Sequence, residues 1–213
     1  IMESGFDGIF LVISNPVDII THYVQFLSGL PKNQVIGTGT AIDSARLQNM
    51  IAQIAKVDPR SVHAYSMGEH GDSQMVPWST VTVAGKPFYD VIADNKELVG
   101  DVDLDELVYK TTQEGWEILN RKGTTYYGIA TACAGIIKAI LNDENRIIPV
   151  STLLEGEYGE KDVYAGVPTV LNRYGASDVL EIHMTPGELS RFKESTKVIR
   201  EYTDRILEIH KSL

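Results

Sequence analysis

Gly8-Ile9-Phe10-Leu11-Val12-Ile13 is the stretch that decides the fold of the first part of this chain. It is short, apolar and partly β-branched, which is typical of a central strand in a parallel sheet. Asn15-Pro16 ends the strand, because proline cannot donate to a sheet ladder. Residues 17–29 predict a helix with a glycine stop signal, and Val35-Ile36-Gly37 predicts a second strand. Strand, helix and strand in so short a space indicate a βαβ unit of an α/β fold.

The first five residues, Ile1-Met2-Glu3-Ser4-Gly5, lack the basic segment that begins a signal peptide. They resemble the end of a helix that leads into the strand. We therefore expect the chain to be the C-terminal portion of a longer polypeptide, cut in or after a helix.

The composition is that of a globular protein: 43% of the 213 residues are hydrophobic and 23% are charged. A formal net charge of -10 argues against nucleic acid as a partner, since nucleic-acid binding depends on basic patches. The longest apolar run, residues 8–13, is far too short to span a membrane, so we expect no membrane partner. The single cysteine, Cys133, excludes an internal disulfide framework, and a reducing cytoplasm is the expected location.

The pattern changes at Ala41, so we expect two units, residues 1–40 and residues 41–213. Helices are expected from residue 41, where apolar side chains recur at helical spacing, at residues 104–121 and at residues 124–141. The last of these is rich in Ala, Gly and Ile, which predicts a buried helix. A hairpin is expected at residues 76–83 with its turn at 84–87. Strands at residues 147–153, 163–171 and 179–183 suit an antiparallel sheet.

A long helix is expected to close the chain. Thr185-Pro186-Gly187-Glu188 has the pattern of a capping box with proline at the first helical position. An apolar stripe then follows at helical spacing, formed by Leu189, Phe192, Ile199, Tyr202 and Ile206.

The clearest candidate for chemistry is His70, in Gly68-Glu69-His70-Gly71-Asp72. Flanking glycines allow the backbone to turn tightly beside a ligand, and histidine can exchange a proton near neutral pH. His70 is therefore a candidate general acid that acts as a base in the reverse direction. A histidine in a surface turn is the alternative that this motif alone leaves open.

Asp43 and Arg46 stand three residues apart and share a helix face. A carboxylate bonded to one imidazole nitrogen would fix the tautomer of His70 and stabilise its charged form. A guanidinium can hold a substrate carboxylate through two parallel hydrogen bonds. The alternatives are an N-cap role for Asp43, at a helix that begins near Ser44, and a surface salt bridge for Arg46.

Two further polar sites are candidates for ligand contact. Asn15 ends a parallel strand, where α/β sheets bind ligands, although an Asn-Pro turn is the simpler explanation. Thr124 and Thr125 open the predicted buried helix and could meet a substrate or cap the helix. The five histidines show no HxxxH or HxH spacing, so no metal site is expected. Gly37-Thr38-Gly39-Thr40 lacks the third glycine of a dinucleotide fingerprint.

Taken together and in this order, three motifs resemble the C-terminal portion of an L-2-hydroxyacid dehydrogenase of the lactate/malate dehydrogenase family, on the lactate side. They are Ser14-Asn15-Pro16-Val17-Asp18, Asp43-Ser44-Ala45-Arg46 and Gly68-Glu69-His70-Gly71-Asp72. Residues 35–40, 62–65 and 122–130 are also similar to the family. The resemblance implies the α/β tail of a Rossmann domain, residues 1–40, followed by an α+β C-terminal catalytic domain, residues 41–213.

The same resemblance implies NAD as the cofactor and hydride transfer between NAD(H) and a small L-2-hydroxy or 2-oxo acid, lactate and pyruvate first. His70 would be the proton donor and acceptor, Asp43 its orienting partner and Arg46 the anchor of the substrate carboxylate. Asn15 would serve both substrate and cofactor, and Thr125 the substrate. Ser14, Thr38 and Ile129 would lie on the cofactor side. A homo-oligomer, tetramer or dimer, is usual in the family.

The chain departs from the pattern at two positions. Relatives that fructose 1,6-bisphosphate activates carry a second arginine where this chain has Gln48, although His63 of the same effector site is present. We therefore doubt activation by this effector. Gly115 stands where a small alanine is usual near the pocket, and residues 13–16 also resemble those of L-2-hydroxyisocaproate dehydrogenase, which takes branched substrates.

Three alternatives to an L-lactate dehydrogenase remain open from the sequence. A dehydrogenase for branched L-2-hydroxy acids comes first. A malate dehydrogenase comes second, although Glu69 is unusual for it. The third is of another class, a non-catalytic folding or assembly domain, because the chain contains no phosphate-binding loop. We expect the isolated chain to be inactive for the same reason.

Overall fold

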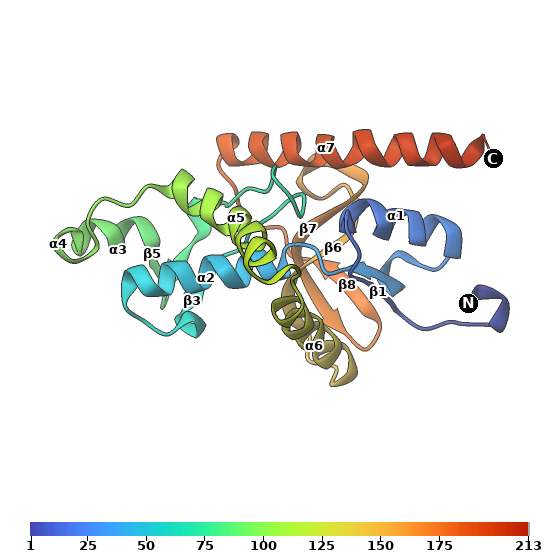
Figure 1. Cartoon of the computed structure of the whole chain (residues 1–213), viewed down its shortest axis with the longest axis horizontal. Coiled ribbons are helices and arrows are strands. Elements are labelled where there is room, and N and C mark those ends of the chain that lie inside the picture. Colours follow the sequence, from blue (N-terminus) through green and yellow to red (C-terminus); the bar gives the residue numbers. More distant parts are fainter. Residues whose placement is uncertain (213) are drawn as a thin grey trace.

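The computed structural model describes residues 1–212, and of Leu98 only the backbone. Its main sheet has five strands in the order β1-β2-β6-β7-β8. β1 (Phe10–Val12) and β2 (Val35–Gly37) run parallel, as the predicted βαβ unit requires. β6 (Arg146–Glu155), β7 (Lys161–Asn172) and β8 (Gly175–Val179) are antiparallel to one another. A single register pair, Gly37 with Ser151, joins the two sets antiparallel, so both predicted units share one sheet (Figure 1).

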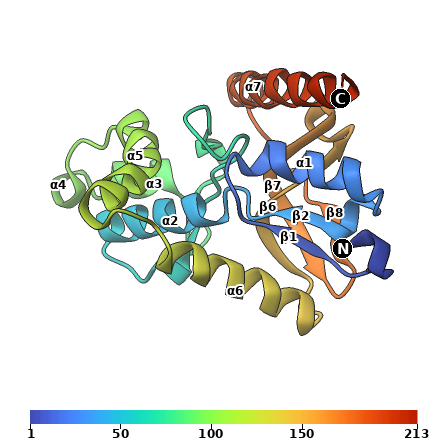
Figure 2. The ribbon, with the colours of Figure 1, turned by 45° about the vertical axis from the view of Figure 1, so that its right-hand side comes forward.

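Helices cover both faces of this sheet (Figure 2). α1 (Val17–Ser28) and α7 (Pro186–Lys211) lie together on one face, over a core that includes Ile19, Leu154, Phe192 and Ile199. α6 (Tyr127–Leu141) lies on the other face and packs through Ile136 and Ala139. Within residues 1–212, none of the helices combines the length and the apolar character that crossing a membrane would need.

A second lobe, with a core of its own, is built around two long helices. They are α2 (Ala41–Ala55) and α5 (Leu104–Lys122), accompanied by α3 (Phe88–Asp94) and α4 (Lys96–Val99). A small antiparallel sheet of β3 (Val62–His63), β4 (Thr82–Val83) and β5 (Lys86–Pro87) completes the lobe. Leu47, Trp78 and Phe88 are among the buried side chains that hold it together. The long loop that carries His70 returns from this lobe to the main sheet.

Several local predictions are confirmed. α1 ends at Gly29, whose φ of 65° is left-handed, and α5 follows the predicted residues 104–121 closely. Thr185 and Glu188 form both hydrogen bonds of a capping box at the start of α7. Gly39 of the rejected fingerprint has a packing role instead, because a Cβ on it would lie 2.3 Å from the backbone nitrogen of Ser151.

Other local predictions are wrong. α6 starts at Tyr127, not at residue 124, and is mostly not buried: Leu141 is 78% exposed, because only its Ile136 and Ala139 face reaches the sheet. The stripe on α7 likewise includes an exposed residue, Tyr202. The predicted hairpin is confirmed only in its last part: β4 and β5 pair antiparallel around Ala84-Gly85, whereas residues 78–80 form a 3-10 turn after Pro77.

The third predicted strand of the antiparallel set is also misplaced. It was expected at residues 179–183, whereas β8 occupies Gly175–Val179 and pairs with the end of β7. A Cβ on Gly175 would lie 1.9 Å from the carbonyl oxygen of Asn33, so glycine lets the strand begin there. The amide of Ile182 leaves the ladder and donates to the hydroxyl of Tyr158.

Candidate active site

The structure places all eight predicted site residues around one cavity of about 630 Å³. Its lining comes from the carboxyl ends of the parallel strands β1 and β2, the first turns of α2, the loop around His70, one side of α5, and the start of α6 with the segment that leads into it. The predicted residues that line the cavity are Ser14, Asn15, Thr38, Asp43, Arg46, His70, Thr125 and Ile129. Ligands bind at the carboxyl ends of strands in open α/β sheets, so the position suits a binding site.

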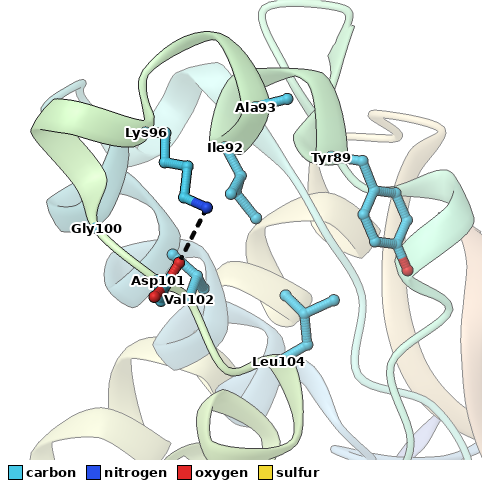
Figure 3. Close-up of a pocket in the computed structure, with 8 residues that line it drawn as sticks. All are labelled: Tyr89, Ile92, Ala93, Lys96, Gly100, Asp101, Val102 and Leu104. Atoms are coloured by element: carbon cyan, nitrogen blue, oxygen red, sulfur yellow. Dashed lines mark ion pairs between the residues drawn. The ribbon is translucent and has the colours of Figure 1, made fainter.

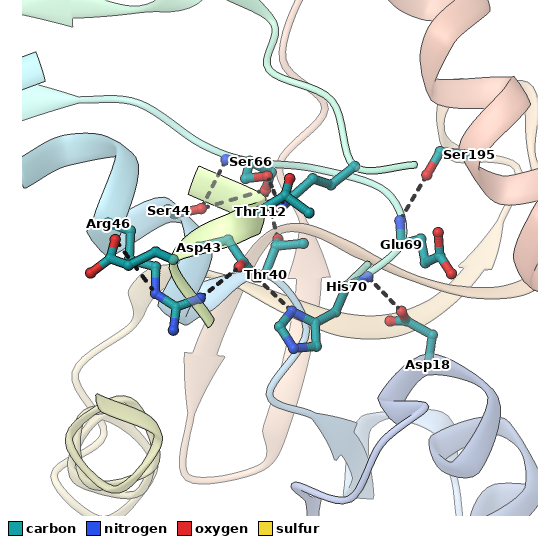
Figure 4. Close-up of polar contacts among 12 residues, drawn as sticks. Asp18, Thr40, Asp43, Ser44, Arg46, Ser66, Glu69, His70, Thr112 and Ser195 are labelled. Carbon is teal, nitrogen blue, oxygen red and sulfur yellow. Dashed lines mark hydrogen bonds and ion pairs between the residues drawn. The ribbon is translucent and has the colours of Figure 1, made fainter. Parts of the chain in front are cut away.

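His70 and Asp43 form a short polar pair in the cavity (Figure 4). His70 Nδ1 lies 2.6 Å from Asp43 Oδ2, and the Asp43 side chain is only 3% exposed. An ionised carboxylate only accepts hydrogen bonds, so Nδ1 carries the hydrogen and Nε2 is left for another partner. Burial disfavours the charged imidazolium, but the hydrogen bond and charge of Asp43 outweigh it and raise the pKa of His70 above its ordinary value.

The N-cap role considered for Asp43 is wrong. α2 begins at Ala41 with Thr40 before it, so Asp43 lies inside the first turn and no side chain caps this helix. Its carboxylate is instead shared between two side chains of the cavity wall, the imidazole of His70 and the guanidinium of Arg46. With His70 protonated, this trio carries one net positive charge, which favours a small anion beside it.

Arg46 belongs to the cavity wall and is not a surface residue, because its side chain is 12% exposed. Nη1 lies 3.4 Å from Asp43 Oδ1, and Nε lies 3.8 Å from Glu114 Oε2 of α5. Neither contact is a short two-pronged bond, so the guanidinium keeps donors for a carboxylate ligand. Gly115 also faces Arg46, and a Cβ there would stand 3.5 Å from Nη1. The missing side chain therefore leaves space beside the Arg46 guanidinium.

The loop that carries His70 is held from three sides. Gly68 and Gly166 of β7 exchange backbone hydrogen bonds of 2.9 and 2.8 Å. The amide of Glu69 donates to Ser195 Oγ of α7 at 2.8 Å, and the amide of His70 donates to Asp18 Oδ2 of α1 at 2.9 Å (Figure 4). Sequence reasoning missed both Asp18 and Ser195. Asp18 stood in the motif at residues 14–18 and in the first turn of an otherwise apolar helix, but neither signal assigned it a role, and Ser195 had no signal.

A buried polar chain supports α2 behind the cavity. Ser44 Oγ accepts from the amide of Ser66 at 2.9 Å, Ser66 Oγ donates to Gln74 Oε1 at 2.6 Å, and Gln74 Nε2 donates to Thr112 Oγ1 at 2.6 Å. These bonds link α2, the His70 loop and α5. The relative placement of Asp43 and His70 is thus fixed by a network as well as by their own contact.

Another cavity, of about 500 Å³, lies between α3, α4 and the start of α5 (Figure 3). Its one drawn ion pair joins Lys96 to Asp101 at 3.5 Å, and both side chains are well exposed. It has no buried charged pair comparable to Asp43 and His70. In the described part of the chain, no group of three His, Cys, Asp or Glu side chains could hold a metal ion.

Gln48, at the position where relatives activated by fructose 1,6-bisphosphate carry an arginine, has a structural role in this chain. Gln48 Nε2 donates to the carbonyl oxygen of Ala64 at 2.9 Å, so its amide ties α2 to the segment after β3. His63 is exposed on the neighbouring β3.

Comparisons with known proteins agree with this geometry. The family profile described as lactate/malate dehydrogenase, alpha/beta C-terminal domain, matches residues 40–209. L-lactate dehydrogenase 3 of Bacillus thuringiensis subsp. konkukian is 55% identical over 206 residues, which are 97% of this chain and 65% of that protein. L-lactate dehydrogenase 1 of Bifidobacterium longum subsp. longum is 47% identical over 97% of this chain and 66% of its own length.

A solved structure is similar over the same extent. The minor L-lactate dehydrogenase from Enterococcus mundtii, in its ligands-bound form, superposes with a TM-score of 0.91 at 44% identity. The match covers 96% of this chain and 65% of that one. The chain thus spans a little under two thirds of the length of these relatives.

Proposed function

Because this chain belongs to the lactate/malate dehydrogenase family, we propose that it forms the C-terminal part of an NAD-dependent L-2-hydroxyacid dehydrogenase. We propose lactate and pyruvate as its substrate pair. The observation that carries the proposal is the hydrogen-bonded pair of His70 and Asp43, which shares a cavity with Arg46.

Each step assigned to this chain follows from that arrangement. Arg46 binds the carboxylate of the 2-oxo acid, since its guanidinium retains free donors toward the cavity. His70 donates a proton from Nε2 to the carbonyl oxygen while Asp43 holds Nδ1 and stabilises the imidazolium. Asn15 and Thr125, which both line the cavity, donate hydrogen bonds to the substrate. In the reverse direction His70 takes the hydroxyl proton.

Only the nicotinamide end of NAD has candidate binding residues in this chain. Bound NADH supplies the hydride that reaches the carbon of the 2-oxo acid. Ser14, Asn15 and Thr38, at the carboxyl ends of β1 and β2, would hold its nicotinamide side, and Ile129 would pack against the ring. The glycine fingerprint that binds a pyrophosphate is not part of this sequence. This is why we assign the cofactor to a polypeptide of the length of the relatives.

Three finer features belong to the same proposal. Residues 1–40 are the end of the NAD-binding domain, and residues 41–213 are the catalytic domain. The protein is a homo-oligomer, a tetramer or a dimer, as is usual in the family. Its location is the cytoplasm, in keeping with the single cysteine.

Replacing His70 tests the proposal in the full-length polypeptide. His70→Ala removes proton transfer, so we expect pyruvate reduction to fall by roughly 100- to 10,000-fold. His183→Ala is the matched control, because His183 is exposed and outside the cavity. Turnover of His70→Ala within a few-fold of the control would refute the assigned chemistry.

Branched 2-oxo acids are the second candidate substrates, and Gly115 is the observation in their favour. The space left beside Arg46 could admit a larger side chain. Comparing kcat/KM for pyruvate and for 4-methyl-2-oxopentanoate, in wild type and in Gly115→Ala, decides between the two. A non-catalytic assembly role, the third candidate, would leave both substrates unreduced in every variant.

A further inference from the structure

Asp18 is a buried carboxylate that the proposed reaction does not use. It is the second residue of α1, and only 3% of its surface is exposed. Its Oδ2 accepts a 2.9 Å hydrogen bond from the backbone amide of His70 (Figure 4). The proposed proton donor is therefore held by two carboxylates, Asp43 on its ring and Asp18 on its backbone.

The position of Asp18 links the two proposed domains. α1 belongs to residues 1–40, whereas His70 lies in the second unit. Ser151, whose hydroxyl is buried beside the same carboxylate, pairs with Gly37 where the parallel and antiparallel halves of the sheet join. Among the described residues, neither Asp18 Oδ1 nor Ser151 Oγ has a hydrogen-bond partner. Burying a carboxylate without full hydrogen bonding costs free energy. We therefore look for a function of Asp18 that depends on its negative charge.

Charges surround His70 from several elements. Asp18 of α1 and Asp43 of α2 favour the imidazolium, while Arg46 of α2 disfavours it. Glu69, from the His70 loop, adds a further negative charge near Asp18. Burial raises the pKa of Asp18 to about 6, which still leaves it mainly ionised at pH 7 and above. At those pH values the charge of Asp18 favours the imidazolium of His70.

We propose that Asp18 is a positioning residue for His70: one carboxylate oxygen fixes the His70 backbone, and its charge adds to that of Asp43 in stabilising the imidazolium. This inference rests on the proposed function for its kinetic consequences. The competing explanation is a purely structural one, in which an acidic residue in the first turn only stabilises the start of α1.

Two substitutions separate the parts of this role. Asp18→Asn keeps an oxygen acceptor for the His70 amide but removes the charge, whereas Asp18→Ala removes both. Thr21→Val is the matched control, since Thr21 is buried on the same helix and bonds only the carbonyl oxygen of Val17. Two measurements are made on the full-length polypeptide: the imidazole pKa of His70 by NMR with labelled histidine, and the pH dependence of kcat and KM for pyruvate reduction.

Asp18→Asn should lower the pKa of His70 by about 0.5 to 1 unit, less than the 1 to 3 units typical of a carboxylate in direct contact. Reduction needs protonated His70, so the alkaline decline of kcat/KM should move to lower pH by the same amount. Asp18→Ala should also lower kcat by about tenfold, because a buried amide loses its acceptor, with little change in the KM for NADH. Thr21→Val should change neither quantity.

The NMR measurement does not depend on turnover, so the two hypotheses fail separately. A His70 pKa in Asp18→Asn equal to that of wild type overturns the role of Asp18, even in an active enzyme. A wild-type protein that reduces no 2-oxo acid overturns the proposed function, while the pKa comparison still decides the role of Asp18. Equal kinetic losses in Asp18→Ala and Thr21→Val would favour the purely structural explanation and overturn the proposal.

Discussion

Asp43→Asn removes the charge beside His70 while leaving a side chain of nearly the same shape. In the structure Asp43 Oδ2 lies 2.6 Å from His70 Nδ1, and the carboxylate is almost fully buried, so water screens the interaction poorly. An opposite charge in contact shifts a pKa by about 1 to 3 units, so the pKa of His70 should fall by that amount. Above the lowered pKa, the protonated fraction of His70 then falls by about 10- to 1,000-fold.

The direction of reaction gives this prediction its sharpest test. Pyruvate reduction begins from protonated His70, so its kcat/KM should fall with the protonated fraction. Lactate oxidation begins from neutral His70 and should lose less at alkaline pH. The assay is NADH absorbance in both directions between about pH 6 and 9, the range in which histidine titrates.

Asp58→Asn is the control, because Asp58 is an exposed acid that is paired with Arg60 and does not line the cavity. A reduction rate for Asp43→Asn within about threefold of this control, with an unmoved pH profile, would refute the reasoning. An equal loss in both directions at every pH would show that Asp43 acts through geometry and not through its charge.

Three further predictions use the same full-length polypeptide or the chain itself. Arg46→Lys keeps the charge but loses the planar fork of the guanidinium. The KM for pyruvate should therefore rise by at least about tenfold, with a smaller change in the KM for NADH. Initial rates at varied substrate concentration will measure both. Fructose 1,6-bisphosphate at millimolar concentration should not lower the half-saturating pyruvate concentration, because Gln48 cannot make the charge-assisted phosphate contact of an arginine, worth about 1.5 to 3 kcal/mol. A tenfold fall in that concentration would contradict the prediction. Activation of the Gln48→Arg variant alone would show that this position is the cause. The polypeptide of residues 1–213 should bind no NADH tightly by calorimetry, since it has no fingerprint for the pyrophosphate, and robust turnover by the purified chain would overturn that expectation.

Much of the fold followed from local signals. β1, α1 and β2 were predictable because an apolar run, a glycine stop and a second apolar run lie close together in the sequence. The start of α7 was predictable because its capping box is complete within four residues. Burial of α6 was not predictable in the same way, because it depends on how much of the helix the sheet reaches. The sequence shows that α6 is rich in apolar residues, but not how much of its surface the neighbouring elements cover.

The site residues, too, were predictable where the signal is local and not where it depends on tertiary packing. His70, Asp43 and Arg46 could be named because their motifs are short and their chemistry is characteristic. Asp18 and Ser195 could not, because they meet the His70 loop across 52 and 126 residues of sequence. Such contacts exist only once α1 and α7 have packed on the same face of the sheet. Their residue types, an acid in a first turn and a serine in a helix, have many ordinary explanations.

The loop that carries His70 is bound by both proposed domains. β2 joins β6 through one register pair, so the parallel strands that carry Asn15 and Thr38 are continuous with the sheet that receives the His70 loop. α1 then passes over that junction and binds the His70 amide through Asp18. A shift of residues 1–40 against the rest would break the register pair of Gly37 with Ser151 and the contact of Asp18 with the His70 amide. In the proposed reaction, the geometry between hydride and proton delivery would therefore be set by this one sheet and by α1.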